Sequence, residues 1–268
     1  MTIGDLDDDR EILRQAITQA GDLALQHFRA PPRHWYKGPG QVLTEADLAM
    51  DRLLKDMLLS ARPDDAWLSE ETPDDRSRLE RPRVWVVDPI DGTRTFADRV
   101  PEFSISIALV VEGAPMLGAV LNPATGELFE AARGAGASLN GAAIFTSPAR
   151  ELTGARLLSS RGEIKRRRWG ELMPEAEFTA IGSLAYKLAL VAAGRFDGLV
   201  SLRASHDWDL AAAVLLIEEA GGAISTADGT PLRLNQPEPR HAGLAAAATG
   251  ALREQLVRRL ATRCSHQG

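Results

Sequence analysis

The chain has 268 residues, of which 44% are hydrophobic and 25% charged, and its formal net charge is −6. That length is enough for one large α/β domain or for two smaller lobes that share a core. The acidic balance argues mildly against a nucleic-acid backbone as the main ligand. It does not argue against a small anionic substrate, because a bound metal ion can make the local electrostatic potential positive.

Several features of the sequence bear on its location. The segment from Met1 to Arg10 is acidic, and no signal-like apolar core follows it. No apolar run approaches the length that a membrane span needs. The single cysteine, Cys264, cannot form an intrachain disulfide, which fits a reducing compartment. We therefore expect a soluble, cytoplasmic protein without a membrane partner.

Two helices are expected in the first part of the chain. Apolar residues recur at helical spacing over residues 8–29, and Pro31 ends that helix. Residues 34–42 contain a Gly-Pro-Gly sequence and are expected to form a loop. Thr44 can cap a second helix that runs to residue 60.

The rest of the chain combines short apolar runs with further helical patterns. Strands are expected at 66–69, 84–87, 104–111, 116–121, 128–131, 155–160, 223–226 and 242–247. Helices are expected at 183–193, 207–220 and 249–262. This order predicts an α/β protein of layered sheets and helices. A soft division near residue 150 separates a lobe 1–150 from a lobe 151–268, with no free linker between them.

The most informative segment is an apolar strand that ends in two carboxylates, Asp88 and Asp91, followed at once by Gly92 and Thr93. Pro89 keeps the residue before it extended, and the turn that follows lets the two carboxylates converge. Converging carboxylates repel each other unless a cation lies between them, and oxygen ligands suit Mg²⁺. Backbone N–H groups of Gly92 and Thr93 at a helix start would then suit a phosphate. Aspartates that only cap a turn are the alternative.

Two further acidic positions support a metal site. Glu70 and Glu71 directly follow a buried strand, although alone they would fit an exposed loop. Asp209 precedes an apolar helix face, whereas Asp207 can be a helix N-cap and His206 a surface or capping residue. No set of histidines and cysteines has the spacing of a zinc site.

Together, the segments Glu70-Glu71, Asp88-Pro-Ile-Asp-Gly-Thr93, Trp208-Asp209 and Glu219-Ala-Gly-Gly222 resemble the inositol monophosphatase superfamily. The resemblance covers most of the chain, and the order of these motifs makes it specific. It implies an α-β-α-β-α sandwich of the inositol monophosphatase and fructose-1,6-bisphosphatase type, with metal ions between the two lobes.

The resemblance also implies a metal-dependent phosphoric monoester hydrolase with two or three Mg²⁺ ions. Glu70, Asp88 and the carbonyl of Ile90 would hold one ion. Asp88, Asp91 and Asp209 would hold a second. Such a pair stabilises both the attacking and the departing oxygen of an in-line displacement.

Further roles follow from the same resemblance. Thr93, oriented through Asp47, would position the attacking water, so that Asp47, Thr93 and Glu70 form the catalytic set. Gly92, Thr93 and Asp209 would contact the substrate, and Glu71 would support the ligands. The resemblance also implies lithium inhibition, and members of the superfamily are often homodimers.

Three details favour the branch of 3′(2′),5′-bisphosphate nucleotidases of the CysQ type, which convert 3′-phosphoadenosine 5′-phosphate to AMP. Arg94 follows the Asp-Gly-Thr motif, Arg161 follows a serine at a strand end, and Lys187 lies in the helix 183–193. Extra cations would suit a second phosphate on the substrate. Against this, Thr95 replaces the glutamate usual in that branch. The alternatives are an inositol-1-monophosphatase or a fructose-1,6-bisphosphatase.

Two basic segments and one non-catalytic alternative remain. The run Lys165-Arg166-Arg167-Arg168 is expected to be a solvated helix face. A mobile surface loop is expected to carry Arg76, Arg78, Arg81 and Arg83. Some superfamily relatives bind within RNA transcription complexes, but the acidic charge and the complete ligand set weigh against that as the main function.

Overall fold

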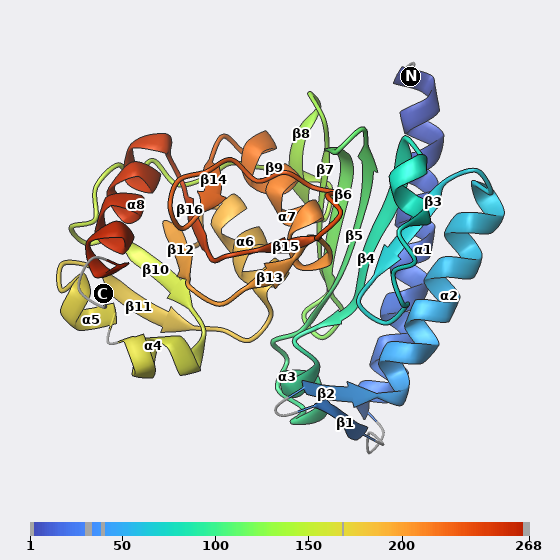
Figure 1. Ribbon diagram of the computed structural model, residues 1–268, viewed down its shortest axis with the longest axis horizontal. Coiled ribbons are helices and arrows are strands. Elements are labelled where there is room, and N and C mark those ends of the chain that lie inside the picture. The colour runs from blue at the N-terminus through green and yellow to red at the C-terminus, as the bar shows by residue number, and fades with distance from the viewer. Residues whose placement is uncertain (1–2, 30–33, 39–40, 168, 265–268) are drawn as a thin grey trace.

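A computed structural model describes residues 3–29, 34–38, 41–167 and 169–264 of the chain. Within them, two large β-sheets alternate with layers of helices (Figure 1). The helices are α1 (Ile3–Arg29), α2 (Glu45–Ala61), η1 (Ser77–Glu80, a 3₁₀ turn), α3 (Thr93–Ala97), α4 (Arg161–Arg167), α5 (Trp169–Leu172), α6 (Leu184–Ala192), α7 (Asp207–Glu219) and α8 (Gly250–Cys264).

The larger sheet has seven strands in the order β3-β4-β5-β6-β7-β8-β9. β3 runs parallel to β4, and every later pair is antiparallel; from β5 onward these strands are joined by short turns. The strands are β3 (Ala66–Ser69), β4 (Arg83–Asp91), β5 (Ser104–Val111), β6 (Ala114–Asn122), β7 (Glu127–Ala132), β8 (Gly136–Leu139) and β9 (Ala142–Ile144).

Both faces of the seven-stranded sheet are covered, and alternation along β4 shows how. Trp85 and Val87 pack with α1 and α2, whereas Val84 and Val86 point to the opposite face and pack with α6 and α7. This explains why β4 reads as a continuous apolar run and not as an alternating one.

The smaller sheet has five strands in the order β11-β10-β12-β16-β14. β10 is parallel to both of its neighbours, and β16 is antiparallel to both of its own. One face packs on α6 and α7, and the other packs on α5 and α8. The strands are β10 (Arg156–Ser159), β11 (Glu177–Ala180), β12 (Gly198–Ser201), β14 (Ala223–Thr226) and β16 (Leu244–Ala247). The five layers therefore follow the expected α-β-α-β-α order.

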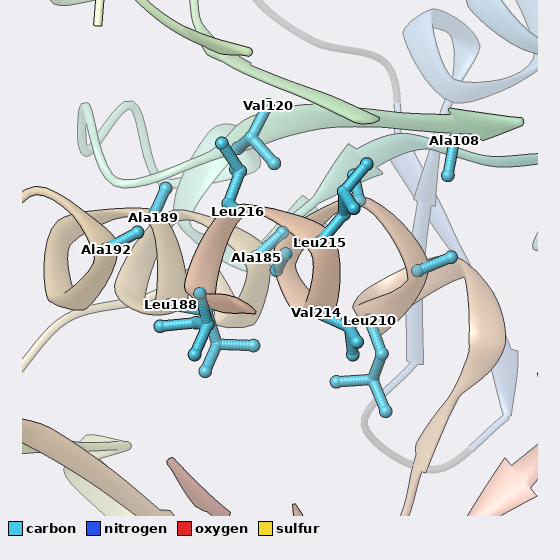
Figure 2. Packing of buried hydrophobic residues seen from close by; sticks show 14 of the residues in the cluster. Ala108, Val120, Ala185, Leu188, Ala189, Ala192, Leu210, Val214, Leu215 and Leu216 are labelled. Carbon is cyan, nitrogen blue, oxygen red and sulfur yellow. The ribbon is translucent and has the colours of Figure 1, made fainter. Parts of the chain in front are cut away.

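The central layer of α6 and α7 is apolar on all sides because a sheet covers each face of it. Every residue of α7 from Leu210 to Ile217 is buried. In Figure 2, Leu216 lies beside Val120 of β6, while Leu188 and Val214 point away from that strand. A Cβ on Gly118 of β6 would lie 2.9 Å from the Cα of Ala212, so glycine is what allows this close approach.

Two predictions about local structure are wrong. Residues 34–42 are not a loop: β1 (His34–Gly38) pairs antiparallel with β2 (Gln41–Thr44), and residues 39 and 40 of the Gly-Pro-Gly sequence lie outside the described residues. Glycine and proline are common both in irregular loops and in the turns of β-hairpins, so the Gly-Pro-Gly sequence does not distinguish the two. The second helix begins at Glu45 with Thr44 as its N-cap, as expected.

The other wrong prediction is the arginine-rich surface loop. Arg83 lies in β4, where its guanidinium group binds Asp65 and Asp9. Arg78 is only 1% exposed, because its guanidinium group has partners inside the fold. Arg76 and Arg81 are exposed, as expected. No described helix is long and apolar enough to span a bilayer.

Candidate metal centre

Three carboxylates converge where the end of β4 meets the start of α7. One oxygen from each of Asp88, Asp91 and Asp209 lies within 4.8 Å of the other two, so the group can hold a metal ion. The pairing register with β5 shifts between Asp88 and Asp91. Pro89, which has no N–H to donate to the ladder, lies at this irregularity. The distortion lets both carboxylates face α7.

Asp88 is the least compensated carboxylate of the three. It is 1% exposed, and neither of its oxygens accepts a hydrogen bond within the described residues. Burial and then the charges of Glu70, Asp91 and Asp209 raise its pKa well above the usual value. A buried carboxylate without a donor is costly, and a hard cation removes that cost. The residues present therefore fit an ion such as Mg²⁺.

Asp91 is anchored to the start of α6. Its Oδ2 accepts hydrogen bonds from the Ser183 hydroxyl at 2.5 Å and from the Ala185 N–H at 2.6 Å. Ser183 is also the N-cap of α6, and its hydroxyl lies 2.9 Å from that of Ser104 on β5. Burial nevertheless raises the pKa of Asp91, since it outweighs these bonds. The other oxygen of Asp91, Oδ1, accepts neither of these two hydrogen bonds.

Asp209 belongs to the first turn of α7. Its Oδ2 accepts a hydrogen bond from the backbone N–H of His206, the N-cap residue, at 2.6 Å. Burial and then the charge of Asp91 raise its pKa to about 7. His206 is the N-cap residue of α7, as expected, and its ring stacks on Trp208 with centroids 4.5 Å apart.

Asp47, Thr93 and the Ile90 carbonyl lie together, as the resemblance implies. The Thr93 hydroxyl is 3.2 Å from Asp47 Oδ1 and 3.0 Å from the Ile90 oxygen. The other oxygen of Asp47 accepts hydrogen bonds from the N–H and the hydroxyl of Thr44. Burial raises the pKa of Asp47 to about 6, although the Thr44 bonds oppose the shift.

The two glutamates lie at the edge of this site. Glu70 is exposed just after β3, and its N–H donates to the oxygen of Val87. It is not among the three carboxylates that converge within 4.8 Å, but its charge acts on Asp88. Glu71 is half-buried, and its charge raises the pKa of Asp47.

Gly92 is required by its backbone conformation. Its φ is +93°, and a Cβ there would lie 2.9 Å from Thr95 Oγ1. The Thr95 hydroxyl lies 2.7 Å from the oxygens of both Gly92 and Glu102, so Thr95 holds the turn at the start of α3. Arg94, in the same turn, is exposed.

The positively charged groups of Arg161 and Lys187 both have partners within the protein. Arg161 is the first residue of α4, and its Nη2 binds Glu102 at 2.7 Å. Lys187 is 4% exposed, and its Nζ donates to the carbonyls of Ile181 and Gly182, each at 3.2 Å. Burial lowers the pKa of Lys187 to about 8, against the raising effect of Asp91.

Sequence reasoning missed several residues around the site. Ser106 lies directly across from Asp88 on β5, and its buried hydroxyl has no hydrogen-bond partner within the described residues. The signal was available, because Ser104 and Ser106 alternate with isoleucines in an otherwise apolar strand. Arg203, which is exposed, lowers the pKa of Lys187 and opposes the raised pKa of Asp209. No motif pointed to it.

The layered fold and a buried carboxylate cluster that fits a cation define a class of metal-dependent α/β hydrolase. The inositol monophosphatase family model matches residues 5–264, so the chain belongs to the inositol monophosphatase family, whose members are metal-dependent phosphatases acting on phosphoric monoesters. This confirms the superfamily and the fold class expected from the sequence.

Similar proteins carry two kinds of name. The inositol-1-monophosphatase of Rhizobium meliloti (strain 1021) is 37% identical over 228 residues, 81% of this chain and 85% of that protein. The Nus factor SuhB of Escherichia coli (strain K12) is 34% identical over 226 residues, 80% of this chain and 84% of that protein. The structure of a Thermotoga maritima IMPase superposes with a TM-score of 0.85 at 27% identity, covering 99% of this chain and 100% of the other.

Proposed function

We propose that this phosphatase is Mg²⁺-dependent and hydrolyses the phosphate ester of a small polyol, with inositol 1-phosphate as the representative substrate. The observation that carries the metal dependence is the buried Asp88 carboxylate, which accepts no hydrogen bond from the described part of the chain and lies beside Asp91 and Asp209. Oxygen ligands of this kind suit Mg²⁺, which prefers carboxylates, water and phosphate.

We assign the ligands as the resemblance implied them. The residues that would hold Mg²⁺ are Glu70, Asp88, Asp91, Asp209 and, through its carbonyl, Ile90. The chemistry that Mg²⁺ supplies when bound is polarisation of the phosphoryl group and a lowered pKa of water. Glu70 extends from a loop at the rim, so it would complete a site whose floor is formed by β4 and α7.

The remaining residues would orient the reactants. When Thr93 donates its hydroxyl proton to Asp47, its oxygen lone pairs are free to accept a hydrogen bond from the attacking water. Asp47, with a pKa of about 6, can take up a proton near neutral pH. The N–H groups of Gly92 and Thr93 would contact the phosphate. The water oxygen would bond to phosphorus as the ester P–O bond breaks, with the proton lost by the water passing through Thr93 to Asp47 and the departing oxygen taking a proton from solvent to leave as the alcohol.

The choice of a monophosphate over a bisphosphate nucleotide rests on the cations. Arg161 and Lys187 were the residues expected to bind a second phosphate, but one is paired with Glu102 and the other faces two backbone carbonyls. A relative covering most of the chain is named inositol-1-monophosphatase. The comparisons thus favour the alternative over the nucleotidase prediction. Inhibition by Li⁺ is a further expectation.

A second candidate is a binding role in a transcription complex, because several similar proteins are named Nus factor SuhB. In α4, Lys165 and Arg166 are exposed, as expected of a solvated face, whereas Arg168 lies outside the described residues. Asp91→Asn discriminates the two roles: it should abolish phosphate release and leave a pure binding function intact.

Residues 1–150 and 151–268 would form two lobes of one unit. Asp88 and Asp91 would come from the first lobe, and Asp209 would come from the second.

The decisive experiment measures phosphate release with Mg²⁺ from inositol 1-phosphate, 3′-phosphoadenosine 5′-phosphate and fructose 1,6-bisphosphate. We expect kcat/KM to favour inositol 1-phosphate by about tenfold or more, which equals about 1.4 kcal/mol of transition-state discrimination. Preference for the adenosine bisphosphate would restore the nucleotidase assignment. No release from any of the three would overturn the proposal.

A further inference from the structure

Arg78 is a charged side chain held inside the protein, where it is 1% exposed. Its guanidinium group binds both oxygens of Asp74, with Nη2 2.9 Å from Oδ2 and Nε 3.1 Å from Oδ1. Asp74 lies four residues after Glu70, in the segment between β3 and η1. This ion pair therefore organises the loop that carries a proposed metal ligand.

The same guanidinium group reaches a segment far away in the sequence. Nη1 donates to the Asn235 side-chain oxygen at 2.5 Å, and Nη2 donates to the Gln236 carbonyl at 3.0 Å. Asn235 has a φ of +54°, a conformation that asparagine tolerates better than most residues. The Glu70 loop is thus hydrogen-bonded to residues 235 and 236.

Asn235 in turn is attached to the start of α7. Its N–H donates to Asp207 Oδ2 at 2.6 Å, and Asp207 Oδ1 lies 2.7 Å from His241 Nε2. Asp207 is fully buried and lies two residues before Asp209. It is not the N-cap of α7, a position that His206 occupies.

We propose that Arg78, Asn235 and Asp207 form a positioning clamp that sets where Glu70 lies relative to Asp209, and thereby sets the affinity of the site for its metal ion. The clamp joins the loop of one proposed ligand to the helix start of another through direct hydrogen bonds. This inference rests on the proposed function only in taking Glu70 and Asp209 as metal ligands.

A positioning role explains these contacts better than stability alone does. Arg78 is buried and the Asp74 side chain is 22% exposed, and such an ion pair contributes little net stability, since the cost of removing charge from water offsets much of the attraction. It does impose one geometry, because the planar guanidinium group binds its partners in fixed directions. Partners that orient metal ligands commonly change metal affinity by about 10- to 100-fold when they are removed.

The test uses Mn²⁺ as a spectroscopic substitute for Mg²⁺ and measures its dissociation constant by electron paramagnetic resonance in the full chain. Arg78→Met removes the guanidinium group. Asn235→Gly removes its acceptor but keeps both the positive φ and the N–H that binds Asp207. Arg76→Met is the matched control. The Arg76 side chain forms an exposed ion pair with Glu238, with exposures of 59% and 80%, and the substitution keeps the Arg76 backbone N–H that donates to Asp74.

We expect both clamp variants to raise the Mn²⁺ dissociation constant by about tenfold, while Arg76→Met changes it by less than about twofold. Circular dichroism identifies variants that fold. If Arg78→Met does not fold, the milder Asn235→Gly variant decides the question. Unchanged Mn²⁺ affinity in a folded clamp variant would overturn the proposal.

Phosphate release is measured separately and tests the proposed function. Wild-type protein that binds Mn²⁺ but hydrolyses none of the three substrates would contradict the proposed activity and leave the clamp result standing. Wild-type protein that binds no Mn²⁺ would contradict both.

Discussion

The end of β4 and the start of α7 each carry two aspartates, and within each pair the two carboxylates differ in their partners. On β4, Asp91 accepts two hydrogen bonds from the start of α6, whereas Asp88 accepts none within the described residues. On α7, Asp207 is held by Asn235 and His241, whereas Asp209 has one bond to its own helix start.

This difference separates two uses of a buried carboxylate. A carboxylate that protein donors satisfy supports the fold, and its removal leaves those donors without a partner. Burying a carboxylate that has no hydrogen-bond donor costs free energy, and a bound cation offsets that cost. Mutations at Asp88 should therefore lower activity while leaving the stability of the metal-free protein almost unchanged. Mutations at Asp207 should lower the stability of the metal-free protein, in addition to any effect on metal affinity through the clamp.

The largest effect is expected for Asp88→Asn. Turnover with Mg²⁺ should fall roughly a thousandfold, the scale seen when a key electrostatic group is removed from an active site. The free energy of unfolding of the metal-free protein should stay equal or rise, because a buried charge is lost. Steady-state kinetics and urea unfolding measure both. Near-normal turnover in a folded variant would contradict the metal assignment.

Asp207→Ala should have the next largest effect, on stability. Removing the carboxylate leaves the Asn235 N–H and the His241 ring without their partner, which should cost about 3 kcal/mol of unfolding free energy. Urea unfolding without metal measures this cost. A loss no greater than that of Asp88→Asn would remove the distinction between the two aspartates.

The pH dependence of stability tests Asp209. Its pKa is about 7 in the folded protein against a reference of 3.8, so the folded state binds the extra proton. The stability this contributes is fully present below pH 3.8 and is lost as the pH rises toward 7.

Asp209→Asn should thus gain stability relative to wild type across this window. The gain should reach about 2 kcal/mol, half of what the full shift would give at about 1.4 kcal/mol per pKa unit. Unfolding of both metal-free proteins at a series of pH values measures the difference. A difference that does not change with pH would show that Asp209 titrates normally.

Ser183→Ala should have the smallest effect. It removes the N-cap of α6 and one donor to Asp91, at a cost of about 1 kcal/mol. Ser106→Ala is the matched control, since the Ser106 hydroxyl has no partner within the described residues and its loss should not destabilise the metal-free protein. Equal costs for the two serines would contradict these assignments.

Much of the fold could be predicted, because local pattern and burial agree. α7 spans Asp207–Glu219 against an expected helix at 207–220, and β14 spans Ala223–Thr226, as expected. Strands β8, β9, β11 and β12 were missed, since each is only three or four residues long. Their pairing with neighbouring strands makes them regular, and a local window does not include those neighbours.

The site was predictable to a similar extent. The positions of Asp88 and Asp91 followed from a strand that ends in two acids, and motif order added Asp209. The expectations for Arg161 and Lys187 as substrate cations were weaker, because residue type alone does not show what a cation is paired with. Glu102 and the carbonyls of Ile181 and Gly182 are the partners they have here.

The sequence by itself determined the layered architecture, the family and the carboxylates that converge, since strand and helix periodicity and short motifs are local properties. Only the tertiary structure decided which carboxylates have donors and which arginine is buried. Those outcomes depend on contacts between distant residues, such as Arg78 with Asn235, 157 positions apart. Burial makes an unpartnered charge costly, and the partners that relieve this cost come from elsewhere in the chain.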